Sequence, residues 1–157
     1  SGAERDLDRS VALLPTAAAH YGLGLLAQDT GNRSKALNHF REAAASQSSS
    51  GKAAAIALVT MDLPAQPQKY LRSRLVLNNS GRVIIQLDNP TPVSVVSVVV
   101  ELGQRNSDGS IRGVQRYRLR QSIGPGKRAS LGTDIRLDDP AQIRQWKNRV
   151  VSAQVVK

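Results

Sequence analysis

The side chains best suited to chemistry in this sequence are arginines and lysines in its C-terminal third. Four arginines fall at even-numbered positions between residues 112 and 120, and a Lys-Arg pair follows in the next turn. Alternate residues of a strand share a face. The predicted basic stripe consists of Arg112, Arg116, Arg118, Arg120, Lys127 and Arg128. Such a stripe binds acidic protein or envelope surfaces electrostatically, or it is a solvated strand face that discourages edge-to-edge aggregation.

Nucleic acid is the other class of partner to which basic residues point. Proteins that bind single strands stack the bases on exposed aromatic side chains. Only five residues of this chain are aromatic, and Tyr117 alternates with the arginines, so that it points to the opposite, inward face. We therefore expect a protein partner and keep a basic nucleic-acid-binding protein that uses residues 112–120 as the alternative.

Other residue types lack the spacing that catalysis or metal binding requires. The chain has no Cys, which excludes disulfides and Cys-ligated zinc. His20 and His39 have no HExxH context and no acid at ligand spacing, so we assign them structural roles. There is no Gly-x-Ser-x-Gly motif, and Gly22-Leu23-Gly24 lies within a predicted helix rather than between a strand and a helix. The sequence predicts no catalytic residue, no cofactor and no metal ligand.

The charge of the chain is concentrated toward its C-terminus. The formal net charge is +10. Residues 1–50 contain five basic and five acidic side chains, whereas residues 101–157 contain twelve basic and five acidic ones. No apolar run approaches the roughly 20 residues that a membrane-spanning helix needs, so we predict no transmembrane segment.

The elements in the first part of the chain are predicted to be helices. Residues 4–14 carry apolar side chains on one helical face, and Pro15 ends that helix. Two amphipathic helices with a tight turn at 29–32 fill residues 16–46, with Asn32 as the cap of the second helix. Residues 47–51 are expected to form a loop. A third helix over 52–61 is expected to face this hairpin with Ile56 and Val59.

The spacing of the hairpin resembles the tetratricopeptide repeat (TPR). The repeat positions are His20, Leu23, Gly24, Ala27, Ala36, Phe40 and Ala43. Gly24 and Ala36 are small enough to let two helix backbones approach closely. His20 and Ala27 stand where the family prefers large aromatic residues. The resemblance implies a stacking unit, with the helix over 4–14 as the end of an earlier repeat and the helix over 52–61 as a cover.

The second part of the chain is predicted to be all β apart from one short helix. Its strands alternate in hydrophobicity and are separated by turns rich in Asn, Asp, Gly and Pro. On the longest strand, Val96, Val98, Val100 and Leu102 are expected to share one face. Asp139-Pro140 is expected to start the short helix. Six or so short strands of this kind favour an antiparallel immunoglobulin-like β-sandwich.

The order of turn and strand signals also resembles FxLYD-type sandwich domains of bacterial envelope proteins. The matching residues are Asn89-Pro90-Thr91, Val95–Val100, Asp108-Gly109 and Pro125-Gly126. A TPR hairpin followed by such a sandwich resembles the C-terminal accessory region of bacterial periplasmic TPR-containing zinc metallopeptidases. The resemblance implies a non-catalytic module of a longer chain, in the periplasm or cell envelope, with a cytoplasmic location as the alternative.

The sequence thus predicts an α+β chain with three parts. Residues 1–63 form a TPR-like helical segment, residues 64–69 a linker, and residues 70–157 a β-sandwich domain. The predicted role is protein–protein interaction. The partner's identity and the oligomeric state are not encoded in any pattern that we recognise.

Overall fold

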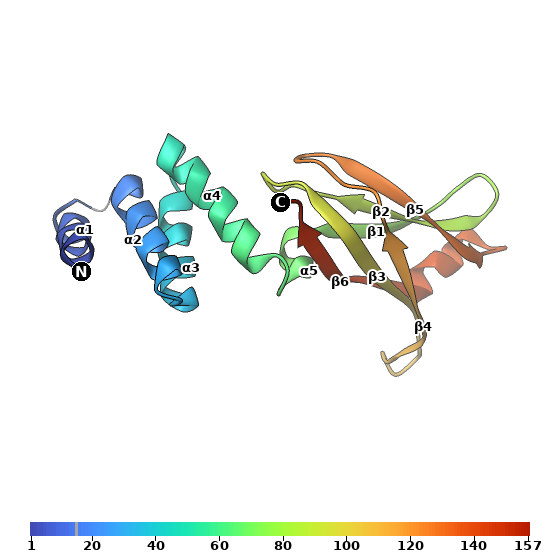
Figure 1. Ribbon diagram of the computed structural model, residues 1–157. Coiled ribbons are helices and arrows are strands. Elements are labelled where there is room, and N and C mark those ends of the chain that lie inside the picture. Colours follow the sequence, from blue (N-terminus) through green and yellow to red (C-terminus); the bar gives the residue numbers. More distant parts are fainter. Residues whose placement is uncertain (15) are drawn as a thin grey trace. The chain divides into compact units, whose positions relative to one another are not determined.

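The computed structural model describes residues 1–14 and 16–157 and has a mixed α+β architecture (Figure 1). Helices at the N-terminus are followed by two small antiparallel sheets, which confirms the predicted class at this level. The chain divides into a helical unit, Ser1–Asp62, and a sheet unit, Leu63–Lys157. The predicted linker over 64–69 falls in the sheet unit, where the short helix α5 (Pro67–Tyr70) begins. Pro15, the predicted end of the first helix, lies outside the described residues.

The helical unit contains α1 (Gly2–Leu13), α2 (Ala17–Asp29), α3 (Arg33–Ala44) and α4 (Ser49–Asp62). Side-chain caps fix the start of both hairpin helices. Thr16 Oγ1 accepts a hydrogen bond from the Ala19 amide at 3.1 Å, and Asn32 Oδ1 accepts one from the Lys35 amide at 3.1 Å. The predicted cap at Asn32 is confirmed, because its side chain satisfies a first-turn amide that has no partner within the helix.

The core of the helical unit forms where α2 and α3 approach each other closely. Phe40 is completely buried, and its ring lies directly over Gly24. A Cβ atom at Gly24 would come within 2.5 Å of two atoms of that ring, so only glycine fits without a shift. Small side chains complete this contact at Ala27, Ala36 and Ala43, all of which are buried. Leu23 is also buried, whereas His20 is half-buried.

Helix α4 differs in two ways from its prediction. It begins at Ser49 instead of residue 52, because Gly51 allows its first turn to pack against the Ser46 carbonyl. Its face toward the hairpin contains Ala54, Leu58 and Met61. Val59 is buried as expected, but Ile56 is 46% exposed, so the prediction that Ile56 faces the hairpin is wrong.

The sheet unit consists of two three-stranded antiparallel sheets. One has the strand order β1-β2-β5, with β1 (Arg72–Leu77), β2 (Arg82–Asp88) and β5 (Arg128–Arg136). The other has the order β4-β3-β6, with β4 (Ile111–Leu119), β3 (Val95–Arg105) and β6 (Trp146–Val155). The 3₁₀ helix η1 (Pro140–Gln145) precedes β6, and Asp139 caps it as predicted.

Alternating side chains of β2 and β3 supply much of the core of the sheet unit. Val83, Ile85 and Leu87 of β2 are 1% exposed or less. On β3, Val95, Val98, Val100 and Leu102 are fully buried and Val99 is 9% exposed. Val98, Val100 and Leu102 are thus buried as predicted, whereas Val96 is only half-buried. Ser97, with a φ of +54°, forms a β-bulge that adds one residue to β3. Because of this extra residue, Val95 and Val98 are both buried although they are three positions apart.

Asn89 ties together the loops at one end of the sheet unit. Its side chain is 1% exposed, and its Nδ2 donates to the carbonyls of Val93, Ile123 and Gly124 at 2.8–3.1 Å. Its Oδ1 accepts hydrogen bonds from the amide and hydroxyl of Thr91. Every polar group of the amide is thereby satisfied away from water. The Asn-Pro-Thr-Pro segment that ends β2 is therefore a buried hydrogen-bonded junction.

Candidate binding surface

The outer face of the β4-β3-β6 sheet carries exposed cations from all three of its strands. Strand register defines it: Arg118 pairs with Val99, Arg116 with Glu101, and Glu101 in turn with Arg149 of β6. The alternate residues of β3, including Val98 and Val100, are buried on the other side. Arg116 and Arg118 of the predicted stripe therefore lie together on this outer face.

Arg112 does not share the face of Arg116 and Arg118, so the prediction of one continuous stripe is wrong. Between Arg112 and Gln115, β4 contains one more residue than the paired part of β3. Gly113, with a φ of +61°, absorbs this bulge. Arg112 is consequently paired with Gln104, and its guanidinium donates to Gln104 Oε1 at 3.3 Å.

The remaining predicted residues lie in other places. Arg120 follows the end of β4 and is exposed. Lys127 and Arg128 belong to the turn and the first residue of β5, in the other sheet, where Arg128 forms an ion pair with Asp88. Consecutive strands of the predicted hairpin thus enter different sheets, which separates the positive charges that the sequence places close together.

Glu101 links two strands across the outer face. Its Oε1 accepts hydrogen bonds from the Nε and Nη2 of Arg116 at 3.0 and 2.9 Å, and its Oε2 accepts one from Arg149 Nη2 at 2.8 Å. These hydrogen bonds, first with Arg149 and then with Arg116, lower the pKa of the Glu101 carboxyl. Glu101 remains ionised and is shared by two arginines.

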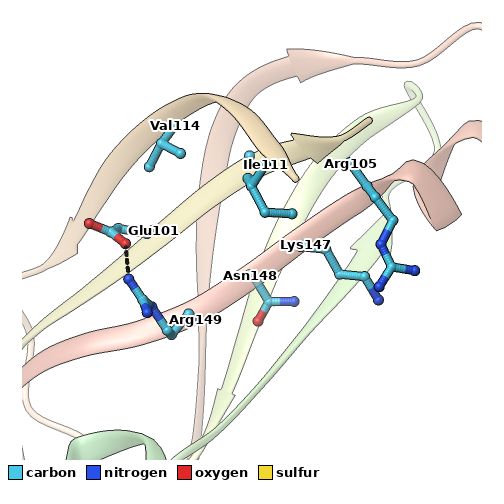
Figure 2. A pocket seen from close by; sticks show the side chains of 8 residues that line it. Glu101, Arg105, Ile111, Val114, Lys147, Asn148 and Arg149 are labelled. Carbon is cyan, nitrogen blue, oxygen red and sulfur yellow. Dashed lines mark hydrogen bonds and ion pairs between the residues drawn. The ribbon is translucent and has the colours of Figure 1, made fainter. Parts of the chain in front are cut away.

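Two hollows flank this ion-pair cluster on the outer face. One, of about 370 Å³, is lined by Val99, Arg116, Arg118, Val151 and Ser152. The other, of about 470 Å³, lies beyond Glu101 and Arg149 (Figure 2). Figure 2 shows Glu101 and Val114 toward one end of the second hollow, Arg105 and Lys147 toward the other, and Ile111 between them. The outer face therefore combines cations with concave apolar surface.

Tyr117 lies on the inward side of β4, as its alternation with the arginines predicts. It is half-buried, and its hydroxyl donates a hydrogen bond to Asp134 Oδ1 of β5. Burial and then this hydrogen bond raise the pKa of Tyr117 far above its usual value. The Tyr117 ring is therefore not available on the outer face for stacking against a base.

The two histidines contact each other in the helical unit. His20 Nδ1 and His39 Nδ1 are 3.1 Å apart, so one ring donates a hydrogen bond to the other. Burial and then the neighbouring His20 lower the pKa of His39. Across residues 1–14 and 16–157, no three His, Cys, Asp or Glu side chains gather into a potential metal site. In the same residues, no helix is both long and apolar enough to cross a membrane.

The sequence patterns did not identify Arg105, Lys147 and Arg149 as part of this surface. Lys147 pairs with Gly103 and Arg149 with Glu101, so the register between β3 and β6 brings these cations to the outer face. The only sequence signal was the alternation of Lys147 and Arg149 in the last strand. Without the strand pairing, that alternation does not reveal which face the two side chains occupy.

Comparisons with known proteins do not show a family for this chain. No protein-family model matches it, and no curated protein matches it. Among solved structures, one similar chain is the Northeast Structural Genomics Consortium target SoR45, with a TM-score of 0.30, 9% identity, and coverage of 55% of this chain and 82% of that one. Another is the Pseudomonas fluorescens alkylpurine DNA glycosylase AlkC bound to DNA containing an abasic site analog, with a TM-score of 0.31, 11% identity, and coverage of 75% of this chain and 43% of that one. Likeness at this level carries no functional argument.

Proposed function

We propose that this chain is a non-catalytic protein–protein interaction region of a bacterial cell-envelope protein. The observation that carries the proposal is the outer face of the β4-β3-β6 sheet, where exposed arginines adjoin a hollow with a mainly apolar lining. Exposed cations steer an acidic partner toward a surface. Concave apolar area beside them supplies contact energy that charge alone does not.

The helical unit supports the same proposal through its resemblance to a TPR hairpin. Close packing of Phe40 on Gly24 brings α2 and α3 together as the repeat pattern requires. Exposed apolar side chains remain on the unit at Leu13, Leu14 and Ile56. In a repeat array each unit buries such surface against its neighbour. We propose that the chain is the C-terminal accessory part of a longer protein, such as a periplasmic metallopeptidase.

The sheet unit supports an assignment to immunoglobulin-like sandwiches of the FxLYD type. Two antiparallel sheets with buried facing residues have the layers of such a sandwich. The buried hydrogen bonds of Asn89 explain why an Asn-Pro-Thr segment, which is part of the resemblance to FxLYD domains, is suited to the end of β2. A gene that encoded nothing N-terminal to Ser1 would contradict the accessory-region proposal.

Affinity capture from bacterial envelope extract tests the interaction role. The full chain is compared with the double variant Arg116→Glu/Arg118→Glu. The matched control, Arg72→Glu/Arg74→Glu, makes the same charge change on β1 of the other sheet, where both arginines are exposed. We expect specific protein partners to be lost with the first variant and kept with the control. An identical partner set for all three proteins would contradict the role of the outer face.

The alternative, nucleic-acid binding, is favoured only by the positive charge of the sheet unit. It is tested with a labelled random oligonucleotide in a salt titration. A phosphate-driven complex remains measurable at about 0.1 M salt. We expect no measurable binding there, because the predicted cations are divided between two sheets instead of forming one continuous strip for a phosphate backbone, and the outer face has no exposed aromatic ring that could stack on a base. Binding that persists and is lost with Arg116→Glu/Arg118→Glu would replace the protein-interaction proposal.

A further inference from the structure

The larger hollow on the outer face is formed around a residue without a side chain. A Cβ atom at Gly103 would lie 2.4 Å from Ile111 Cγ2 and 3.2 Å from Val114 Cγ2. The side chains of Ile111 and Val114 therefore both pack against Gly103 and occupy the space that a larger residue would fill. Residues three apart in a regular strand point to opposite faces, and the bulge at Gly113 is what places both on this one.

These two side chains make an apolar wall that water reaches. Ile111 is 42% exposed and Val114 51% exposed. They line a concavity of about 470 Å³, which is within the range of ligand-binding pockets, roughly 300–1,000 Å³. A concave apolar wall accepts a protruding aliphatic side chain of a partner, whereas insertion into a bilayer requires apolar side chains that protrude from the protein.

The charges around the hollow that lack an ion-pair partner are positive. Its one carboxylate, Glu101, already binds Arg116 and Arg149. Arg105 and Lys147, toward the other end in Figure 2, form no ion pair with any residue that the structure describes. Two cations without acidic partners therefore stand beside the apolar wall.

We propose that this hollow binds an acidic peptide segment of a partner protein, with an aliphatic side chain against Ile111 and Val114 and a neighbouring carboxylate on Arg105 and Lys147. The proposal rests on the interaction role proposed above and names the chemistry of the partner. Charge complementarity selects an acidic segment, since residues 63–157 contain sixteen basic and six acidic side chains. A bare phosphate backbone would leave the aliphatic wall unused.

Nuclear magnetic resonance titration of the full chain with a short blocked Glu-Leu-Glu peptide tests this assignment. At about 5 mM peptide, a site with a Kd of about 1 mM is well populated. We expect the largest amide shifts at Gly103, Ile111, Val114 and Lys147. A peptide with Gln in place of Glu, and one with Ala in place of Leu, should each bind about tenfold more weakly. No shift at the hollow, or equal binding of the Ala peptide, would overturn the proposal.

Two double variants test whether the Glu-Leu-Glu peptide binds at the hollow. Arg105→Ala/Lys147→Ala is expected to weaken Glu-Leu-Glu binding about tenfold, while Arg72→Ala/Arg74→Ala, which removes the same charge from the other sheet, changes it less than about twofold. Equal weakening in both variants would reduce the binding to net charge and overturn the proposal. Anionic vesicles or an oligonucleotide that shift the same amides more strongly than the peptide would also overturn it. If peptide binding at the hollow fails while capture of envelope proteins still depends on Arg116 and Arg118, only the acidic-peptide proposal is contradicted. The proposed protein–protein interaction role would stand, so failure of one proposal can be told from failure of the other.

Discussion

The helical and sheet units differ most in where their charge lies. Residues 1–62 contain six basic and six acidic side chains, whereas residues 63–157 contain sixteen and six, so the whole net charge of +10 belongs to the sheet unit. The cores differ too. The helical unit buries mostly alanines around Phe40, while the sheet unit buries Val, Ile and Leu.

The surfaces of the two units are therefore determined by different features. In the helical unit, small side chains bring helices close together, and the contact depends on one aromatic ring and one glycine. In the sheet unit, bulges at Ser97 and Gly113 decide which side chains face outward. The first unit is therefore expected to respond mainly to changes of volume, and the second to changes of hydrogen bonding and charge.

The largest effect is expected from Phe40→Ala. Removing a fully buried aromatic side chain destabilises a core by about 4 kcal/mol, and the neighbouring buried side chains Ala27, Ala36, Ala43 and Ala54 are too small to fill the gap. Circular dichroism at the helical minimum should show early melting. Fluorescence of Trp146, the only tryptophan, reports the sheet unit and should change little. Leu25→Ala, at a position 39% exposed, is the control. Loss of both signals together would show that the units are not thermodynamically distinct.

Asn89→Ala should have the next largest effect and should act on the other unit. It leaves the buried carbonyls of Val93 and Ile123 without this donor, which is expected to destabilise the sheet unit by about 3 kcal/mol. Urea unfolding monitored by Trp146 fluorescence measures it. Asn79→Ala, at an exposed turn position, serves as the control. A midpoint equal to that of the control would contradict the role of Asn89 as a buried junction.

Glu101→Gln tests whether the charge of the outer face is what selects its partner. The change removes the carboxylate that Arg116 and Arg149 share. Affinity for an acidic peptide should rise about threefold, since two exposed ion pairs are released. The peptide titration described above measures this affinity. A weaker complex would indicate that the ion-pair cluster positions the arginines for binding.

The smallest effect concerns pH and the helical unit. Burial and His20 depress the pKa of folded His39, and Lys35 adds to this, while Asp8 and Glu42 oppose it. The unfolded state therefore takes up a proton first as the pH falls below about 6.5. Stability present above that pH should decline as the pH falls toward the lower pKa of folded His39. His39→Asn should flatten the dependence in thermal melts between pH 7.5 and pH 5, and an unchanged slope would assign it to other groups.

The sequence predicted best those features that depend on residues close together in the chain. The hairpin helices, their turn and the Asn32 cap follow from residues a few positions apart, and the structure has them. The position of Ile56 was wrong because a mostly alanine helix gives little indication of which face is buried.

The basic stripe was the least predictable feature, for a physical reason. A strand pattern fixes a face only while the alternation is regular, and Gly113 interrupts it between Arg112 and Arg116. Glycine inside a strand is itself a signal for a bulge. No local pattern could place Arg105 beside Lys147, since strand pairing across about 40 residues brings them together.

Photo-crosslinking in living bacteria that produce the chain tests most directly the proposal that the outer face of the β4-β3-β6 sheet binds a protein. The photoreactive residue p-benzoylphenylalanine replaces Val114 on that face or, as the control, Ser130 on β5 of the other sheet, which is exposed. We predict a discrete protein adduct from position 114 that disappears with Arg116→Glu/Arg118→Glu, and none from position 130. An adduct from position 130 with none from position 114 would contradict the account.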